Sequence, residues 1–180
     1  MDNGASSYRR YLDGDDNGFA QIVDTYYDGL TLYLNSYVRN LDIAEDLAEE
    51  TLAKLIIKKP KFRGRSSFKT WLYSIGRNLA VDYMRRHSND SVSIDDCLNL
   101  ASDEEVEQNY LHEDSKVMMY RAMARLKTEY RQVLWLYYFE DLDQKEIAQV
   151  MKKSLDSVKH LVSRARLSLK SELEKEDFTL

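Results

Sequence analysis

The chain has 180 residues, 43% of them hydrophobic and 32% charged, with a formal net charge of −5, which is typical of a globular rather than a disordered protein. One Cys excludes an internal disulfide framework, three scattered His lack the spacing of metal ligands, and one Pro with six Gly disfavours a β-sandwich or barrel. The N-terminus shows no apolar signal-peptide segment and no apolar run approaches the roughly 20 residues of a membrane-spanning helix, so we expect a soluble cytoplasmic protein that needs no cofactor.

The first predicted elements are two helices. Apolar side chains recur at three- and four-residue steps after Gly14, which is typical of a helix with one buried face. They are Phe19, Ile22, Val23, Tyr26, Leu30, Leu34 and Tyr37. Asp42, followed by Glu45, predicts a capping box at the start of a second helix, and Pro60 predicts its end.

A basic segment follows, with ten Lys or Arg and one acidic residue between positions 54 and 87. Ser66 or Ser67 can cap a helix that runs to about His87. Cations interleaved with aromatic rings suit single-stranded nucleic acid, because the cations attract its backbone and the rings stack on its bases. Trp71 fits two interpretations equally well, since its ring can belong to the core or receive a base.

Positions 88–115 reverse this charge, with nine acidic residues and no Lys or Arg. Helical periodicity fades there while Ser, Asn and Asp accumulate, so we expect a linker, with which short helical turns are compatible. The sequence therefore predicts an all-α protein with two small helical domains, residues 1–88 and 115–180, joined by a flexible acidic linker at 89–114.

The second domain is helical throughout by pattern. Its first helix spans about Ser115–Leu126, and the next begins at Thr128. Asp143 and Glu146 repeat the capping-box signal at the start of a short helix. Lys152 then stands where a turn usually needs Gly, so we expect it to adopt a positive φ.

A final helix completes this domain. Its predicted buried stripe contains Val158, Leu161, Val162, Ala165, Leu169 and Leu173. A short helix, a turn and a longer helix form the helix-turn-helix pattern, whose second helix enters the major groove of DNA. An ordinary amphipathic helix with a solvated basic face explains the spacing as well. Two separate cationic segments, the second with six Lys or Arg between 152 and 170, favour nucleic acid.

Three stretches resemble an extracytoplasmic-function sigma factor, a small two-domain member of the bacterial sigma family. They are AEDLAEETLAKLI at 44–56, SSFKTWLYSIGRNLAVDYMRR at 66–86 and YRQVLWLYYFEDLDQKEIAQVMKKSLDSVKHLVSRARLSL at 130–169. The resemblance implies a non-catalytic subunit that binds core RNA polymerase and directs initiation at promoters by recognising their −10 and −35 elements. It also implies an inhibitory anti-sigma partner, no membrane insertion and no small-molecule substrate.

The resemblance and the charge pattern together place three surfaces on this chain. The polymerase-binding residues are Asp46, Glu49, Glu50 and Leu52. The residues for the opening −10 element are Lys61, Phe62, Arg63, Arg65, Ser66, Lys69, Trp71, Arg77, Asn78, Arg85 and Arg86. The residues for the −35 duplex are Ser157, Lys159, His160, Ser163, Arg164 and Arg166. Ser74 and Ile75 stand where larger sigma factors carry adjacent Trp residues, which suggests weaker duplex opening and stricter promoter demands.

Two other functions fit parts of the sequence. A helix-turn-helix regulator would need a sensing or dimerising domain in the first unit, and residues 59–86 indicate neither. A nuclease would need clustered carboxylates for metal ions or a nucleophile beside a base, whereas the acidic residues fall on a helix surface and in the linker. Co-elution with core polymerase would separate a sigma factor from a regulator.

Overall fold

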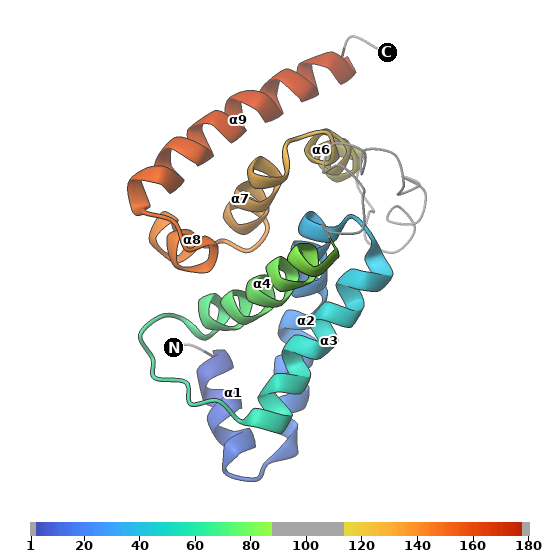
Figure 1. The fold of residues 1–180 in the computed structure, drawn as a ribbon. Coiled ribbons are helices and arrows are strands. Elements are labelled where there is room, and N and C mark those ends of the chain that lie inside the picture. Colours follow the sequence, from blue (N-terminus) through green and yellow to red (C-terminus); the bar gives the residue numbers. More distant parts are fainter. Residues whose placement is uncertain (1–2, 88–113, 178–180) are drawn as a thin grey trace.

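The computed structural model describes residues 3–87 and 114–177, and every regular element within these ranges is a helix (Figure 1). The N-terminal unit contains α1 (Asn3–Leu12), α2 (Asp16–Val38), α3 (Leu41–Lys58) and α4 (Phe68–His87). The C-terminal unit contains α6 (Asp114–Ala124), α7 (Thr128–Tyr138), α8 (Gln144–Met151) and α9 (Leu155–Asp177). The predicted all-α class with two helical units is confirmed. The predicted linker lies outside the described residues, except for its last position.

The helix α1 has no counterpart among the predicted elements. Tyr8 on this helix is 1% exposed, and its hydroxyl donates to the carbonyl oxygen of Pro60 at 2.9 Å. The helix α2 crosses α1 closely at Gly18, where a Cβ atom would lie 2.3 Å from the carbonyl oxygen of Ser7. Contacts with distant parts of the chain therefore stabilise α1, and such contacts leave no local periodicity in the sequence.

The start of α3 differs from the prediction. The Asn40 side chain accepts a hydrogen bond from the Ile43 N–H at 3.0 Å, so Asn40 is the N-cap and the helix begins at Leu41. The predicted capping box at Asp42 is wrong, because Asp42 already lies in the first helical turn. An Asn in extended backbone just before an apolar residue was the competing signal, and Asn caps a helix as well as Asp does.

The starts of α4 and α8 agree with the prediction. Ser67 Oγ accepts a hydrogen bond from the Thr70 N–H at 3.2 Å, which identifies the capping serine of α4. Asp143 Oδ1 accepts from the Glu146 N–H at 2.9 Å, and Glu146 Oε2 accepts from the Asp143 N–H at 3.1 Å. The capping box of α8 is therefore confirmed, and it satisfies two backbone donors that the helix itself leaves unpaired.

The turn between α8 and α9 centres on Lys152. Its φ is 53°, in the left-handed region, and its N–H donates to carbonyl oxygens of α8. The predicted positive φ is confirmed. A left-handed residue ends α8 and redirects the chain, so that α9 can pack against the helix before it.

We expect Lys152→Gly to leave the melting temperature unchanged or to raise it. Glycine adopts positive φ without the steric cost of a Cβ atom, which is about 1 kcal/mol, although its more flexible unfolded chain offsets part of the gain. The same substitution at exposed Lys170, inside α9, should instead lower the free energy of unfolding by about 1 kcal/mol. Thermal unfolding of both variants, followed by circular dichroism, measures the difference. Destabilisation by Lys152→Gly would contradict the assigned role of the turn.

The two units pack against each other. The helix α8 lies against α4, and α7 lies against α2 (Figure 1). Buried apolar side chains of both units belong to one cluster, which includes Leu30 and Tyr73 from the first unit and Val133 and Ile147 from the second. The helix α9 packs on α6, α7 and α8. Its inner face is thereby buried, and its outer face remains exposed.

Candidate nucleic-acid and protein interfaces

The outer face of α9 carries the residues predicted for the −35 element. All of them are exposed: Ser157, Lys159, His160, Ser163, Arg164 and Arg166. On the opposite face, Val158, Val162 and Ala165 are at most 2% exposed. The helical repeat thus separates an apolar face that holds the helix in place from a polar face with two Arg and one Lys.

Serine hydroxyls order the start of α9. Ser154 Oγ accepts a hydrogen bond from the Ser157 N–H at 3.1 Å and donates to Ser157 Oγ at 2.8 Å. Lys159 Nζ lies 3.4 Å from Asp156 Oδ1, and both side chains are more than half exposed. Such an exposed ion pair contributes little stability, so Lys159 can exchange Asp156 for another anion or acceptor at small cost. The first turns of a recognition helix are where side chains reach base edges.

Arg166 is held by two aromatic rings of α7. Its guanidinium carbon lies 4.6 Å from the ring centroid of Tyr137 and 5.6 Å from that of Tyr138. Cation–π contacts of this kind restrain the guanidinium on the surface without neutralising its charge. The sequence analysis singled out neither tyrosine as a functional residue.

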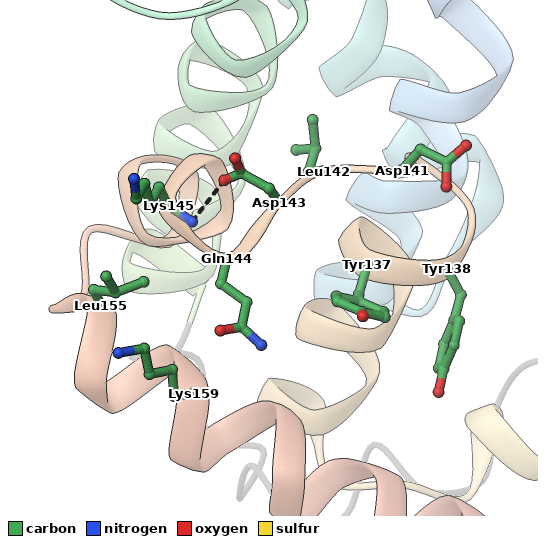
Figure 2. A pocket seen from close by; sticks show the side chains of 9 residues that line it. All are labelled: Tyr137, Tyr138, Asp141, Leu142, Asp143, Gln144, Lys145, Leu155 and Lys159. Atoms are coloured by element: carbon green, nitrogen blue, oxygen red, sulfur yellow. Dashed lines mark hydrogen bonds between the residues drawn. The ribbon is translucent and has the colours of Figure 1, made fainter.

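The same tyrosines border an open groove of the C-terminal unit (Figure 2). It lies between the end of α7, the turn into α8 and the start of α9. Its lining residues are Tyr137, Tyr138, Asp141, Leu142, Asp143, Gln144, Lys145, Leu155 and Lys159. The side chains carry two Lys and two Asp, so the groove has mixed charge. It connects the aromatic surface of α7 with the polar start of α9.

The loop before α4 exposes its cations and packs its ring inward. The exposed side chains are Lys61, Arg63 and Arg65. The ring centroid of Phe62 lies 5.2 Å from that of Trp71 and 5.6 Å from that of buried Phe68. Trp71 also contacts Tyr8, at 5.6 Å between centroids. Part of the Trp71 ring therefore belongs to an aromatic cluster of the core, while the loop cations face outward.

Farther along α4 the predicted −10 residues have different surroundings. Arg77 and Asn78 are half-buried, whereas Arg85 and Arg86 are exposed near the end of the helix. Burial raises the pKa of Tyr37 on α2, and the charge of neighbouring Arg77 opposes this rise. Arg77 therefore lies against the tyrosines of α2, whereas the helix end presents exposed cations, of which Arg85 is paired with Asp82 at 3.3 Å.

At the start of α4, the predicted −10 residue Lys69 already has a partner. Its Nζ lies 2.9 Å from Glu140 Oε2 and donates to the Glu140 carbonyl oxygen at 3.0 Å. The neighbouring Ser66 makes a local bond, from its Oγ to the Ser67 carbonyl oxygen at 3.1 Å. Glu140 belongs to the C-terminal unit and was absent from the predicted sites. A contact between residues 71 positions apart leaves no local signal in the sequence.

The predicted polymerase surface lies on α3. Asp46, Glu49 and Glu50 are exposed along one face. Leu52 is 5% exposed and belongs to the core, so its predicted role in polymerase binding is corrected. The apolar periodicity of α3 already indicated an inward position for it. Ile57, near the end of the same helix, is an apolar side chain that is 79% exposed and was not among the predicted site residues.

The acidic face of α3 also reaches Tyr27 of α2. Burial, followed by the charges of Glu45 and Glu49, raises the pKa of the Tyr27 hydroxyl. The carboxylates of α3 are therefore close enough to α2 for their charge to act on Tyr27. A basic or polar protein surface is the partner that this acidic face would attract.

The described residues contain neither a membrane-spanning helix nor a metal-binding cluster. No helix in the described part of the chain is long and apolar enough to cross a membrane. Within residues 3–87 and 114–177, no group of three or more His, Cys, Asp or Glu side chains is arranged to hold a metal ion.

Comparisons with known proteins identify two matched regions. The family model for sigma-70 region 2 matches residues 22–89, and the model for sigma-70 region 4 matches residues 116–169. The RNA polymerase sigma factor YlaC of Bacillus subtilis is 31% identical over 153 residues, covering 83% of this chain and 88% of the relative. The ECF RNA polymerase sigma factor SigM of the same organism is 29% identical and covers 84% of this chain and 92% of the relative.

Solved structures share the arrangement of helices. The sigma factor RpoE of Bartonella quintana, crystallised with the anti-sigma factor NepR, has a TM-score of 0.71 and 26% identity. That match covers 89% of this chain and 98% of the other. CnrH, in complex with the cytosolic domain of CnrY, has a TM-score of 0.63 at 21% identity and covers 96% of each chain, which shows the fold alone.

Proposed function

Because this chain belongs to the sigma-70 family, and within it to the extracytoplasmic-function sigma factors, we propose that it binds core RNA polymerase and directs transcription initiation at specific promoters. The observation that carries the proposal is the outer face of α9. Six polar or cationic side chains are exposed there on a helix whose opposite face is buried. A helix held in this way is what duplex recognition requires.

The proposed division of work follows the two units. In the C-terminal unit, the start of α9, with Ser157 and Lys159, reads base edges of the −35 element, and Arg164 and Arg166 bind phosphates. In the N-terminal unit, the exposed cations of the loop at 61–67 and of the end of α4 hold the −10 element as it opens. The positive charges of these side chains support that role, because they attract the phosphates of the DNA backbone.

In this proposal the aromatic rings beside the −10 surface contribute less to base stacking than the sequence indicated. Phe62 and Trp71 pack against Phe68, so their rings shape the surface beside the loop. Any stacking on a base would use only the exposed part of Trp71. Lys69 joins the −10 surface once its bond to Glu140 opens.

The proposed partner surface for polymerase is the acidic face of α3. Asp46, Glu49 and Glu50 supply its charge, and Ile57 adds an exposed apolar side chain at its end. The protein has no catalytic role of its own in this proposal and works in the cytoplasm with the polymerase. An anti-sigma factor is the expected inhibitor, since related sigma factors have been crystallised with such proteins.

Run-off transcription with core polymerase over a fragmented genomic library tests this function. We expect the purified chain to co-elute with core polymerase and to produce transcripts from defined start sites that share −10 and −35 sequences. Core polymerase alone is the control. Failure of the chain to bind core polymerase would contradict the proposal and leave the helix-turn-helix regulator, provided that the chain still binds duplex DNA.

A further inference from the structure

Two acidic side chains of the C-terminal unit bind the start of α4. The first is Glu140, in the turn after α7, which is 7% exposed. One of its carboxylate oxygens lies 2.9 Å from Lys69 Nζ, and the other accepts from Trp135 Nε1 at 3.2 Å. The Glu140 carbonyl oxygen accepts a second bond from Lys69 at 3.0 Å. This turn therefore uses both its side chain and its backbone to hold Lys69.

The second is Glu146 on α8. Its Oε1 accepts hydrogen bonds from Ser67 Oγ at 2.8 Å, at the cap of α4, and from Thr70 Oγ1 at 3.0 Å, in the first turn of that helix. Its Oε2 simultaneously accepts the Asp143 N–H that completes the capping box of α8. The Glu146 carboxylate thus completes the cap of α8 and also accepts hydrogen bonds from two hydroxyls of the N-terminal unit.

These donors are of the kind that a nucleic-acid backbone requires. A lysine ammonium and two hydroxyls at the start of a helix attract an anion, and a phosphate oxygen would fit them as a carboxylate does. Lys69 is also one of the residues expected at the −10 element. The carboxylates of the C-terminal unit and a DNA strand would therefore compete for the same groups.

A second contact between the units involves a buried cation. Arg131 on α7 is 7% exposed and donates from Nη2 to the Ser36 carbonyl oxygen, at the end of α2, at 2.9 Å. Burial, with the charge of nearby Arg39, lowers the pKa of Arg131 to about 10. A cation in such a place gains hydration when the units separate, which opposes part of the stabilisation from the apolar cluster that the units share.

We propose that this packing is an autoinhibited state, in which Glu140 and Glu146 occupy the start of α4 and exclude DNA backbone phosphates from it. The proposal rests on the proposed function, which supplies the role of α4. The closed chain holds its two DNA-binding units in a fixed arrangement with one of them masked. Separation of the units exposes Lys69, Ser67 and Thr70 together.

Gly29 on α2 offers a specific way to open the contact. A Cβ atom there would lie 2.6 Å from Glu140 Oε1 and 2.7 Å from the Tyr73 hydroxyl, closer than real Cβ contacts come. Gly29→Ala would therefore push Glu140 away from Lys69. Alanine favours the helical state of α2, but the Tyr73 hydroxyl inside the N-terminal unit must also shift, so the folded state of this variant has to be measured. Glu140→Gln is a second variant, which removes the charge without adding volume.

The experiment compares the full chain with both variants. Thr25→Ala is the matched control, because Thr25 is exposed on the same helix and its hydroxyl bonds to Gln21 of that helix. Small-angle X-ray scattering measures the radius of gyration. Fluorescence anisotropy measures the affinity for a labelled oligo(dT) strand of about 15 nucleotides. Circular dichroism verifies that each variant is folded.

We expect Gly29→Ala and Glu140→Gln to increase the radius of gyration and to bind the oligonucleotide about tenfold more tightly, if only about a tenth of the wild-type chain is open. The Thr25→Ala control should match the wild type in both measurements. An unchanged radius in both folded variants would overturn the closed state. A larger radius without tighter binding would overturn the competition. Failure of the proposed function appears differently, as absence of a complex with core polymerase in every variant.

Discussion

Replacement of Glu49 by Lys is expected to lower the affinity of the chain for core RNA polymerase by tenfold or more. Glu49 is exposed on α3 between Asp46 and Glu50, so the reversal removes one negative charge and places a cation in the proposed contact. Like charges across a protein interface cost up to several kcal/mol, and about 1.4 kcal/mol already corresponds to tenfold. Titration of labelled chain with core polymerase measures the change.

A matched control for this experiment is Asp24→Lys, which makes the same kind of charge reversal at an exposed position of α2. It should leave polymerase affinity within about twofold of the wild type, as expected of a surface charge outside the contact. Binding of both variants to duplex −35 DNA should remain unchanged, because α9 is untouched. Equal polymerase affinity of Glu49→Lys and the wild type would remove α3 as the docking surface.

Replacement of Lys159 by Ala should weaken binding to a −35 duplex by roughly 1–3 kcal/mol, about fivefold to 150-fold, if Lys159 contacts a base edge. The reason is its place in the early turns of α9 and its exposed pair with Asp156, which a base acceptor can replace. Affinity for an unrelated duplex should fall much less. Fluorescence titrations with a duplex identified by run-off transcription, and with a scrambled one, measure this difference.

Arg164→Ala is the comparison that separates base contacts from phosphate contacts. If Arg164 binds a phosphate, its loss should weaken both duplexes alike and reduce the slope of log affinity against log salt by about one. Titration at several salt concentrations gives this slope for each variant. Equal losses on both duplexes for Lys159→Ala would assign Lys159 to the backbone and contradict its proposed role in reading sequence.

The elements and caps that were predicted correctly depend on near neighbours. The capping box of α8 joins Asp143 to Glu146, and the left-handed turn at Lys152 follows from where α8 must end. The buried face of α9 follows from a repeat of 3.6 residues, and its exposed face with it. Caps, turns and helix faces are each determined by residues only a few positions apart, so they can be predicted directly from the sequence.

The errors have equally definite causes. The helix α1 was missed because its buried Tyr8 is held by Pro60, 52 positions away. The capping box at Asp42 was wrong because Asn40, two residues earlier, made the competing cap. Leu52 was assigned to a partner surface on resemblance, although its spacing on α3 indicated the core where the structure places it.

The sequence by itself thus determined the helices after α1, the caps of α4 and α8, the division into two helical units and the polar face of α9, because each depends on local spacing and backbone preference. Only the tertiary structure decided which cations are free. Lys69 and Arg166 are equally plain as basic residues in the sequence, yet one is paired with Glu140 and the other lies on tyrosine rings. Electrostatic and hydrogen-bond energies depend on distance in space, and that distance is set by how the units pack.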